Sequence, residues 1–126
     1  MILGIGTDLI EVERIRASHT RFGERFLRRI LHPAEIAYCL SCHDPAPHLA
    51  ARFAAKEAIS KAFGTGIGGQ LSWLDMEVGR RDSGEPFVIL HGRGLDLLEK
   101  RNGRCVWLSL SHTQAHAAAV AILEGL

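Results

Sequence analysis

The segment 48–63 is the feature that most constrains the fold of this chain. It is rich in alanine and carries lysine and glutamate, but it contains neither glycine nor proline. This is the composition of a well-formed helix. Gly64 follows directly, as expected for a residue that ends a helix in a left-handed conformation. We therefore expect one long central helix, with the other elements packed around it.

The segments before this helix predict one strand and three shorter helices, at residues 2–8, 11–18, 21–30 and 33–42. Pro33 suits the first turn of the third of these helices. The tetrapeptide at residues 44–47, with two prolines, is expected to break that helix and lead into the central one.

The segments after the central helix predict a hairpin, a helix and two further strands. The strands are expected at 75–80, 87–90, 104–111 and 115–123, and the helix at 94–101. This order predicts an α+β fold in which an antiparallel sheet packs with the long central helix.

Length and composition predict one globular domain, residues 1–126. Hydrophobic residues make up 47% of the chain and charged residues 23%, and the net charge is +1. The longest apolar stretches are far too short to span a membrane, and the N-terminus runs into a strand pattern with no basic leader or cleavage site. We expect a cytoplasmic protein without a membrane partner.

Two carboxylates, Asp8 and Glu57, and two lysines, Lys56 and Lys61, are the first candidates for chemistry, with a metal-bound phosphate ester between them. Asp8 follows the apolar start of the first strand, and Glu57 and Lys61 lie four residues apart on one face of the central helix. Mg²⁺ is commonly held by one or two carboxylates together with phosphate oxygens. Alternatively, Glu57 and Lys61 form a solvated ion pair, and Asp8 caps the following helix.

Five motifs, in order along the chain, resemble those of the 4′-phosphopantetheinyl transferases, and more narrowly the small holo-[acyl-carrier-protein] synthase type. They are GIGTDLIEV at 4–12, RFAAKEAISK at 52–61, AFGTGIG at 62–68, GEP at 84–86 and LSLSHT at 108–113. The resemblance runs almost from end to end. It implies the fold of that superfamily and a role in fatty acid biosynthesis.

The resemblance implies transfer of 4′-phosphopantetheine from CoA to a serine of apo acyl carrier protein, releasing adenosine 3′,5′-bisphosphate. Mg²⁺ would be held by Asp8 and Glu57 together with the diphosphate of CoA. Lys61 would offset charge on the leaving phosphate. The sequence leaves open whether Glu57, Lys61 or a water on the metal ion takes the serine proton.

The resemblance also supplies candidate CoA-binding residues. They are Arg52, Lys56, Gly64, Gly66, Pro86, His112 and Thr113. His112 and Thr113 are expected near the 3′-phosphate with Arg52, and the glycines are expected to let the backbone approach the diphosphate or pantetheine. Small synthases of this type are homotrimers with shared active sites. Whether Asp8 and Glu57 of one site come from one chain is left open.

A basic segment lies between residues 14 and 29. It holds six arginines and one acid, Glu24, a local net charge of +5. Nucleic-acid binding is disfavoured, because the whole chain is nearly neutral and has few aromatic residues for base stacking. An acidic acyl carrier protein fits better, with Arg14, Arg21 and Arg25 as candidate contacts. The alternative is an ordinary solvated helix surface.

Three motifs suggest other functions. The glycines at 64–69 match the dinucleotide pattern, but they follow a predicted helix and precede a strand, the reverse of the required order. Cys39 and Cys42 match haem, redox and zinc patterns, yet we expect reduced thiols. His112 and His116 are spaced like a helical zinc pair but are predicted outside helices. A non-catalytic CoA-binding module and a zinc or redox protein remain the alternative functions.

Overall fold

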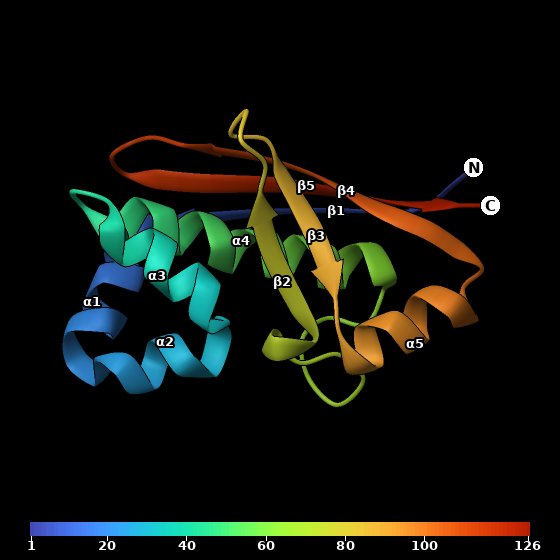
Figure 1. Cartoon of the computed structure of the whole chain (residues 1–126), viewed down its shortest axis with the longest axis horizontal. Coiled ribbons are helices and arrows are strands. Elements are labelled where there is room, and N and C mark those ends of the chain that lie inside the picture. The colour runs from blue at the N-terminus through green and yellow to red at the C-terminus, as the bar shows by residue number, and fades with distance from the viewer.

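Helix α4 (Pro45–Phe63) occupies the middle of the fold (Figure 1). The computed structural model describes all residues from 1 to 126. The helix is longer than the sequence predicts, because the two prolines at 45 and 47 lie in its first turn instead of in a break before it. Proline lacks the N–H that a first turn leaves unbonded, and Asp44 caps this end by accepting from the backbone N–H of Ala46. Gly64 ends the helix with a φ of 79°.

Three strands form an antiparallel sheet in the order β1-β5-β4. They are β1 (Ile2–Glu11), β4 (Gly103–His112) and β5 (His116–Gly125). Strand β1 continues three residues beyond Asp8, where the sequence predicted its end, because β5 keeps pairing with it as far as Glu11 and His116. Asp8 is therefore an interior strand residue, paired with Ala119.

The hairpin β2 (Met76–Arg80) and β3 (Pro86–Leu90) forms a second, separate antiparallel sheet. The expected α+β class is correct, but the strands are divided between two sheets. Figure 1 shows this hairpin crossing in front of α4, and its strand β3 also contacts β4 at the edge of the three-stranded sheet. A short 3₁₀ helix, η1 (Trp73–Asp75), leads into β2.

Three short helices follow β1 and gather at the N-terminal end of α4 (Figure 1). They are α1 (Val12–Phe22), α2 (Glu24–Ile30) and α3 (Pro33–Ser41). Helix α1 runs four residues beyond the predicted end at residue 18, and only Gly23, with a φ of 62°, separates it from α2. Helix α5 (Gly92–Lys100) follows β3 and lies at the end of the hairpin opposite to its turn. No helix has the length and hydropathy needed to cross a membrane.

Strand β1 lies unusually close to α4, and two glycines make this possible. A Cβ at Gly6 would lie 1.8 Å from the carbonyl oxygen of Ala58, and a Cβ at Gly4 would lie 1.9 Å from that of Ala62. These distances are far below any van der Waals contact. The glycines of β1 and the alanines of α4 thus allow the strand backbone to contact the helix. Longer side chains on the two elements can then contact one another.

Candidate active site

Asp8, Glu57 and Lys61 meet within a single chain. The ammonium nitrogen of Lys61 lies 3.3 Å from Oδ1 of Asp8 and donates to the carbonyl oxygen of Thr7 at 2.9 Å. Burial raises the pKa of Glu57, and the negative charge of Asp8 raises it further, while Lys61 acts in the opposite direction. The two carboxylates are therefore neighbours in one chain, which the sequence left open.

The close contact between β1 and α4 explains this meeting. Two strand residues advance about 6.6 Å and four helix residues about 6 Å, so the contacts of Gly4 with Ala62 and of Gly6 with Ala58 run in step. One further step along β1 reaches Asp8, beside the turn of α4 that carries Glu57. The GxGxD pattern of β1 and the alanines spaced four residues apart in α4 thus together place Asp8 beside Glu57.

This donor set fits Mg²⁺. Burial, and after it the negative charge of Asp8, raises the pKa of Glu57. Lys61, whose side chain is 51% exposed, is the only cation that pairs with either carboxylate. Hard oxygen ligands in small number are what Mg²⁺ requires from a protein when a substrate supplies further oxygens. A divalent cation at this position would relieve the repulsion between the two carboxylates.

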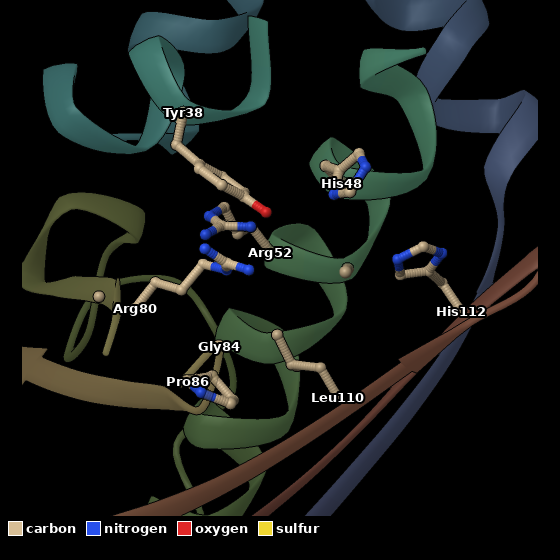
Figure 2. Close-up of a pocket in the computed structure, with 10 residues that line it drawn as sticks. Tyr38, His48, Arg52, Arg80, Gly84, Pro86, Leu110 and His112 are labelled. Atoms are coloured by element: carbon tan, nitrogen blue, oxygen red, sulfur yellow. The ribbon is translucent and has the colours of Figure 1, made fainter. Parts of the chain in front are cut away.

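A second site lies on the other side of α4. A cavity of about 280 Å³ opens between α4, α3, β4 and the β2–β3 hairpin, and none of its ten lining residues is acidic. Its polar lining includes Tyr38, His48, Arg52, Arg80 and His112. Figure 2 shows the guanidinium groups of Arg52 and Arg80 side by side next to the ring of Tyr38. Their carbon centres lie 4.6 and 4.9 Å from the ring centroid.

Arg52 is the most unusual residue in this cavity. Only 5% of it is exposed, it forms no salt bridge, and its Nε has no hydrogen-bond partner. A buried cation without an anion is costly, and stacking on Tyr38 compensates only in part. The side chain is therefore prepared for an anionic ligand that enters the cavity.

Two histidines complete the polar lining of the cavity. The rings of His48 and His112 meet edge to face, with their centroids 5.1 Å apart. Burial lowers the pKa of His48, and the neighbouring positive charges of His112, Arg52 and Arg80 lower it further. An anion in the cavity would oppose that shift. The arrangement is suited to a phosphate group.

Three of the predicted CoA-binding residues, Arg52, Pro86 and His112, line this cavity. Tyr38, His48 and Arg80 also line it and were not predicted. No local motif marks these three residues, since they come from α3, α4 and β2 and meet only through tertiary packing. The position of these three residues in the cavity therefore cannot be predicted from short segments of the sequence.

Other predicted CoA-binding residues lie elsewhere. Lys56 is completely buried and bonds to Glu35, so its ammonium group does not face the cavity. Gly64 and Gly66 lie at the opposite end of α4, with φ values of 79° and 64°, near Lys61. Thr113 is exposed in the β4–β5 turn, where its hydroxyl accepts from the backbone N–H of His116. These residues do not line this cavity.

The two sites face different directions. Arg52 and Glu57 are five residues apart on α4, which places their side chains about 140° apart around the helix axis. The cavity lies on the side of the β2–β3 hairpin, and Asp8 and Lys61 lie on the side of β1. A single chain therefore presents an anion-binding cavity and a carboxylate pair on different flanks of the same helix.

The three alternative motifs do not form the sites that they suggest. All three cysteines are free, and burial raises the pKa of Cys39 to about 11, which keeps its thiol neutral. The glycine-rich loop follows α4, as predicted. His112 ends β4 and His116 begins β5, and His112 packs on His48 instead.

Comparison with known proteins agrees with this arrangement. The sequence model of the 4′-phosphopantetheinyl transferase superfamily matches residues 4–121. A holo-[acyl-carrier-protein] synthase of Koribacter versatilis is 51% identical over 98% of this chain and 99% of its own length. One from Moorella thermoacetica is 48% identical over 98% and 94%.

Solved structures show the same fold. The holo-[acyl-carrier-protein] synthase of Neisseria meningitidis has a TM-score of 0.91 and 37% identity, covering 98% of this chain and 99% of that one. The Helicobacter pylori enzyme in complex with coenzyme A has a TM-score of 0.86 and 34% identity, covering 95% and 99%. The chain therefore belongs to the 4′-phosphopantetheinyl transferase superfamily, within which its similarity is to the holo-[acyl-carrier-protein] synthases.

Proposed function

We propose that this chain is a Mg²⁺-dependent holo-[acyl-carrier-protein] synthase. Acting as one 126-residue domain, it transfers 4′-phosphopantetheine from CoA to a serine of apo acyl carrier protein and releases adenosine 3′,5′-bisphosphate. Fatty acid biosynthesis in the cytoplasm is the expected setting. The names of the relatives and the coenzyme A complex of the Helicobacter pylori enzyme support this proposal.

The observation that carries the proposal is the buried guanidinium of Arg52, which forms no salt bridge and whose Nε has no hydrogen-bond partner, in a cavity without acids. CoA offers a 3′-phosphate on its ribose as a compact anion for such a site. Arg52 and Arg80 would bind it with charge-assisted hydrogen bonds, and His112 would contribute a further ring nitrogen. Pro86 would contact an apolar part of the nucleotide at the edge of the cavity.

The carboxylate site would perform the transfer. The serine oxygen attacks the phosphorus that carries pantetheine, the diphosphate bond breaks, and the bisphosphate leaves with the bonding electrons while the serine loses its proton. Asp8 and Glu57 would hold Mg²⁺, which when bound supplies Lewis-acid polarisation of the phosphoryl oxygens. Lys61 would bind the leaving phosphate, and Gly64 and Gly66 would let the backbone lie close to the chain of the substrate.

A homotrimer with shared active sites would unite the two flanks. The outer face of the three-stranded sheet exposes an apolar cross-strand row of Ile5, Ile122 and Trp107, and in the next row Val120 lies between the hydroxyl residues Thr7 and Ser109. Ile5 is 59% exposed and Trp107 is 54% exposed. Burying this face against two further copies would remove apolar surface from water and would bring the cavity of one copy near the carboxylates of another.

The acidic acyl carrier protein would dock on α1 and α2. Arg16 pairs with Glu13 and Asp44, and Arg28 pairs with Glu24. Arg14, Arg21 and Arg25 are exposed and form no ion pair. These three charges are therefore available to an acidic partner, which they would attract and orient.

Intact mass spectrometry tests the reaction directly. An apo acyl carrier protein is incubated with the purified chain, CoA and Mg²⁺, and the expected result is the mass of one added phosphopantetheine. Asp8→Ala and EDTA should each abolish the addition. If CoA binds but no carrier protein gains mass, the chain is a CoA-binding module and the transferase proposal is wrong.

A further inference from the structure

Three potential metal ligands converge at a place that the proposed reaction does not use. His32 immediately precedes α3, Glu77 lies in β2, and His91 immediately precedes α5. One ligand atom from each lies within 4.8 Å of the other two. The rings of His32 and His91 are tilted by 36°, with their centroids 4.6 Å apart, and His91 Nε2 lies 2.7 Å from Oε1 of Glu77. The cluster shares no residue with the Asp8–Glu57 site.

The hydrogen bond of His32 orients it as a ligand. Its Nε2 lies 2.9 Å from the carbonyl oxygen of Leu74. A carbonyl oxygen only accepts, so this ring nitrogen carries the hydrogen and Nδ1 retains its lone pair. Histidines that bind metal ions typically donate their other ring N–H to a carbonyl or carboxylate in this way. His32 is therefore held in the tautomer that leaves a lone pair on Nδ1, and a cation would have to take this lone pair from the backbone N–H of Glu35, with which the ring forms the capping box of α3.

The charge balance of the cluster also favours a cation. No lysine or arginine forms an ion pair with Glu77: Lys56 pairs with Glu35 and Arg93 pairs with Asp75, although the buried charge of Lys56 also interacts with Glu77 at longer range. Its only ion-pair partner is His91. Charging both stacked imidazoles would place two positive charges next to each other. One divalent ion would instead bind both rings in their neutral form and offset the carboxylate.

We propose that His32, Glu77 and His91 bind one Zn²⁺ ion, with a fourth coordination position left for water. Two imidazoles and one carboxylate form an established zinc donor set, whereas Mg²⁺ prefers oxygen ligands alone. Zinc bonds of about 2.0–2.2 Å require the close pair of His91 and Glu77 to separate by about 0.5 Å. The ion would take the place of the proton between them.

The position of the cluster gives the ion a structural consequence. It would join the α2–α3 connection, the β2–β3 hairpin and the start of α5, which are far apart in the sequence. The same hairpin carries Arg80 and Pro86 of the anion cavity. Bound Zn²⁺ would therefore stabilise the hairpin on which that cavity depends.

Calorimetric titration of the metal-free full chain with Zn²⁺, in excess Mg²⁺, tests the proposal. We expect one equivalent of Zn²⁺ per chain, and at least a tenfold weaker affinity in Glu77→Gln and in His91→Asn. Both substitutions suit the fold, because the first is isosteric and asparagine is a good residue to precede a helix. His19→Ala and Cys42→Ala serve as controls and should bind like the unchanged chain.

Two further readouts do not depend on enzyme activity. Co²⁺ in the same site should give the visible absorption of a four-coordinate nitrogen and oxygen site, absent in His91→Asn. Zn²⁺ should raise the melting temperature of the unchanged chain but not of Glu77→Gln. The proposal is wrong if the unchanged chain takes up no Zn²⁺ at micromolar concentration, or if both variants bind it equally well.

Discussion

The ammonium nitrogen of Lys56 lies 2.9 Å from Oε1 of Glu35, where neither side chain reaches solvent. Lys56 also donates to the carbonyl oxygens of Ile30 and Trp73. Glu35 accepts from the backbone N–H groups of His32 and Val78. Burial lowers the pKa of Lys56, and the charge of Glu35 opposes that shift. This buried pair therefore connects α3 and α4 to β2 and stabilises the core beneath the cavity.

Breaking this pair should lower stability. Lys56→Met leaves the buried carboxylate of Glu35 without its cation, and we expect a loss of about 3–5 kcal/mol in the free energy of unfolding. Urea denaturation measures it. Arg28→Ala, in the exposed pair with Glu24, should change stability by about 0.5 kcal/mol or less. If folded Lys56→Met instead loses affinity for CoA while its stability is unchanged, Lys56 binds CoA and has no structural role.

Arg52→Ala should weaken binding of adenosine 3′,5′-bisphosphate. The substitution removes charge-assisted hydrogen bonds that are each worth about 1.5–3 kcal/mol, so we expect the dissociation constant to rise about 10- to 100-fold. Calorimetry measures it. Arg52→Lys should recover only part of the affinity, because lysine cannot stack on Tyr38 as a planar group. Arg29→Ala is the exposed control, and equal affinities in all variants would contradict the assignment of this cavity.

Gly6→Ala should separate β1 from α4. The added Cβ would lie 1.8 Å from the carbonyl oxygen of Ala58, so the backbone must move. We expect a loss of about 1–3 kcal/mol in stability and about 100-fold in turnover, because Asp8 moves relative to Glu57. Gly68→Ala is the matched control, since a Cβ there meets nothing within 4 Å. Full turnover in Gly6→Ala would show that the carboxylates need no such precision.

The raised pKa of Glu57 predicts a pH-dependent stability in EDTA. Folding favours the protonated carboxyl, so this contribution is complete below the ordinary value of 4.5 and is lost as the pH rises through the higher pKa of the folded state. Glu57→Gln should therefore gain in melting temperature relative to the unchanged chain as the pH rises above 4.5. Glu99→Gln, on the exposed side of α5, should show no such trend. A difference that does not vary with pH would refute the effect.

Reversing the charge of Arg14 should impair use of the carrier protein. Arg14→Glu places a negative charge on the surface proposed for an acidic partner, and we expect the KM for the carrier to rise about five- to tenfold. The effect should shrink at high salt. Steady-state kinetics with varied carrier measure it, and the KM for CoA should not change. An unchanged KM for the carrier would remove α1 from the docking surface.

Local sequence patterns suffice to predict the central helix of this protein, its fold class and its superfamily. A stretch without glycine or proline from 48 to 63 favours a helix whatever surrounds it, because helix propensity and termination are local. The strand patterns and the turn at 82–86 are local in the same sense. The motifs with Asp8, Glu57 and Lys61 also lie in short segments that are recognisable without the fold.

Which of these residues meet depends on the tertiary structure. It extended β1 beyond Asp8 through pairing with β5, which lies at the opposite end of the chain. It buried Lys56 against Glu35, although the lysine sits in a motif rich in functional residues. It also placed Tyr38 and Arg80 around Arg52. Such contacts depend on how separate elements pack, and no short segment of sequence encodes that packing.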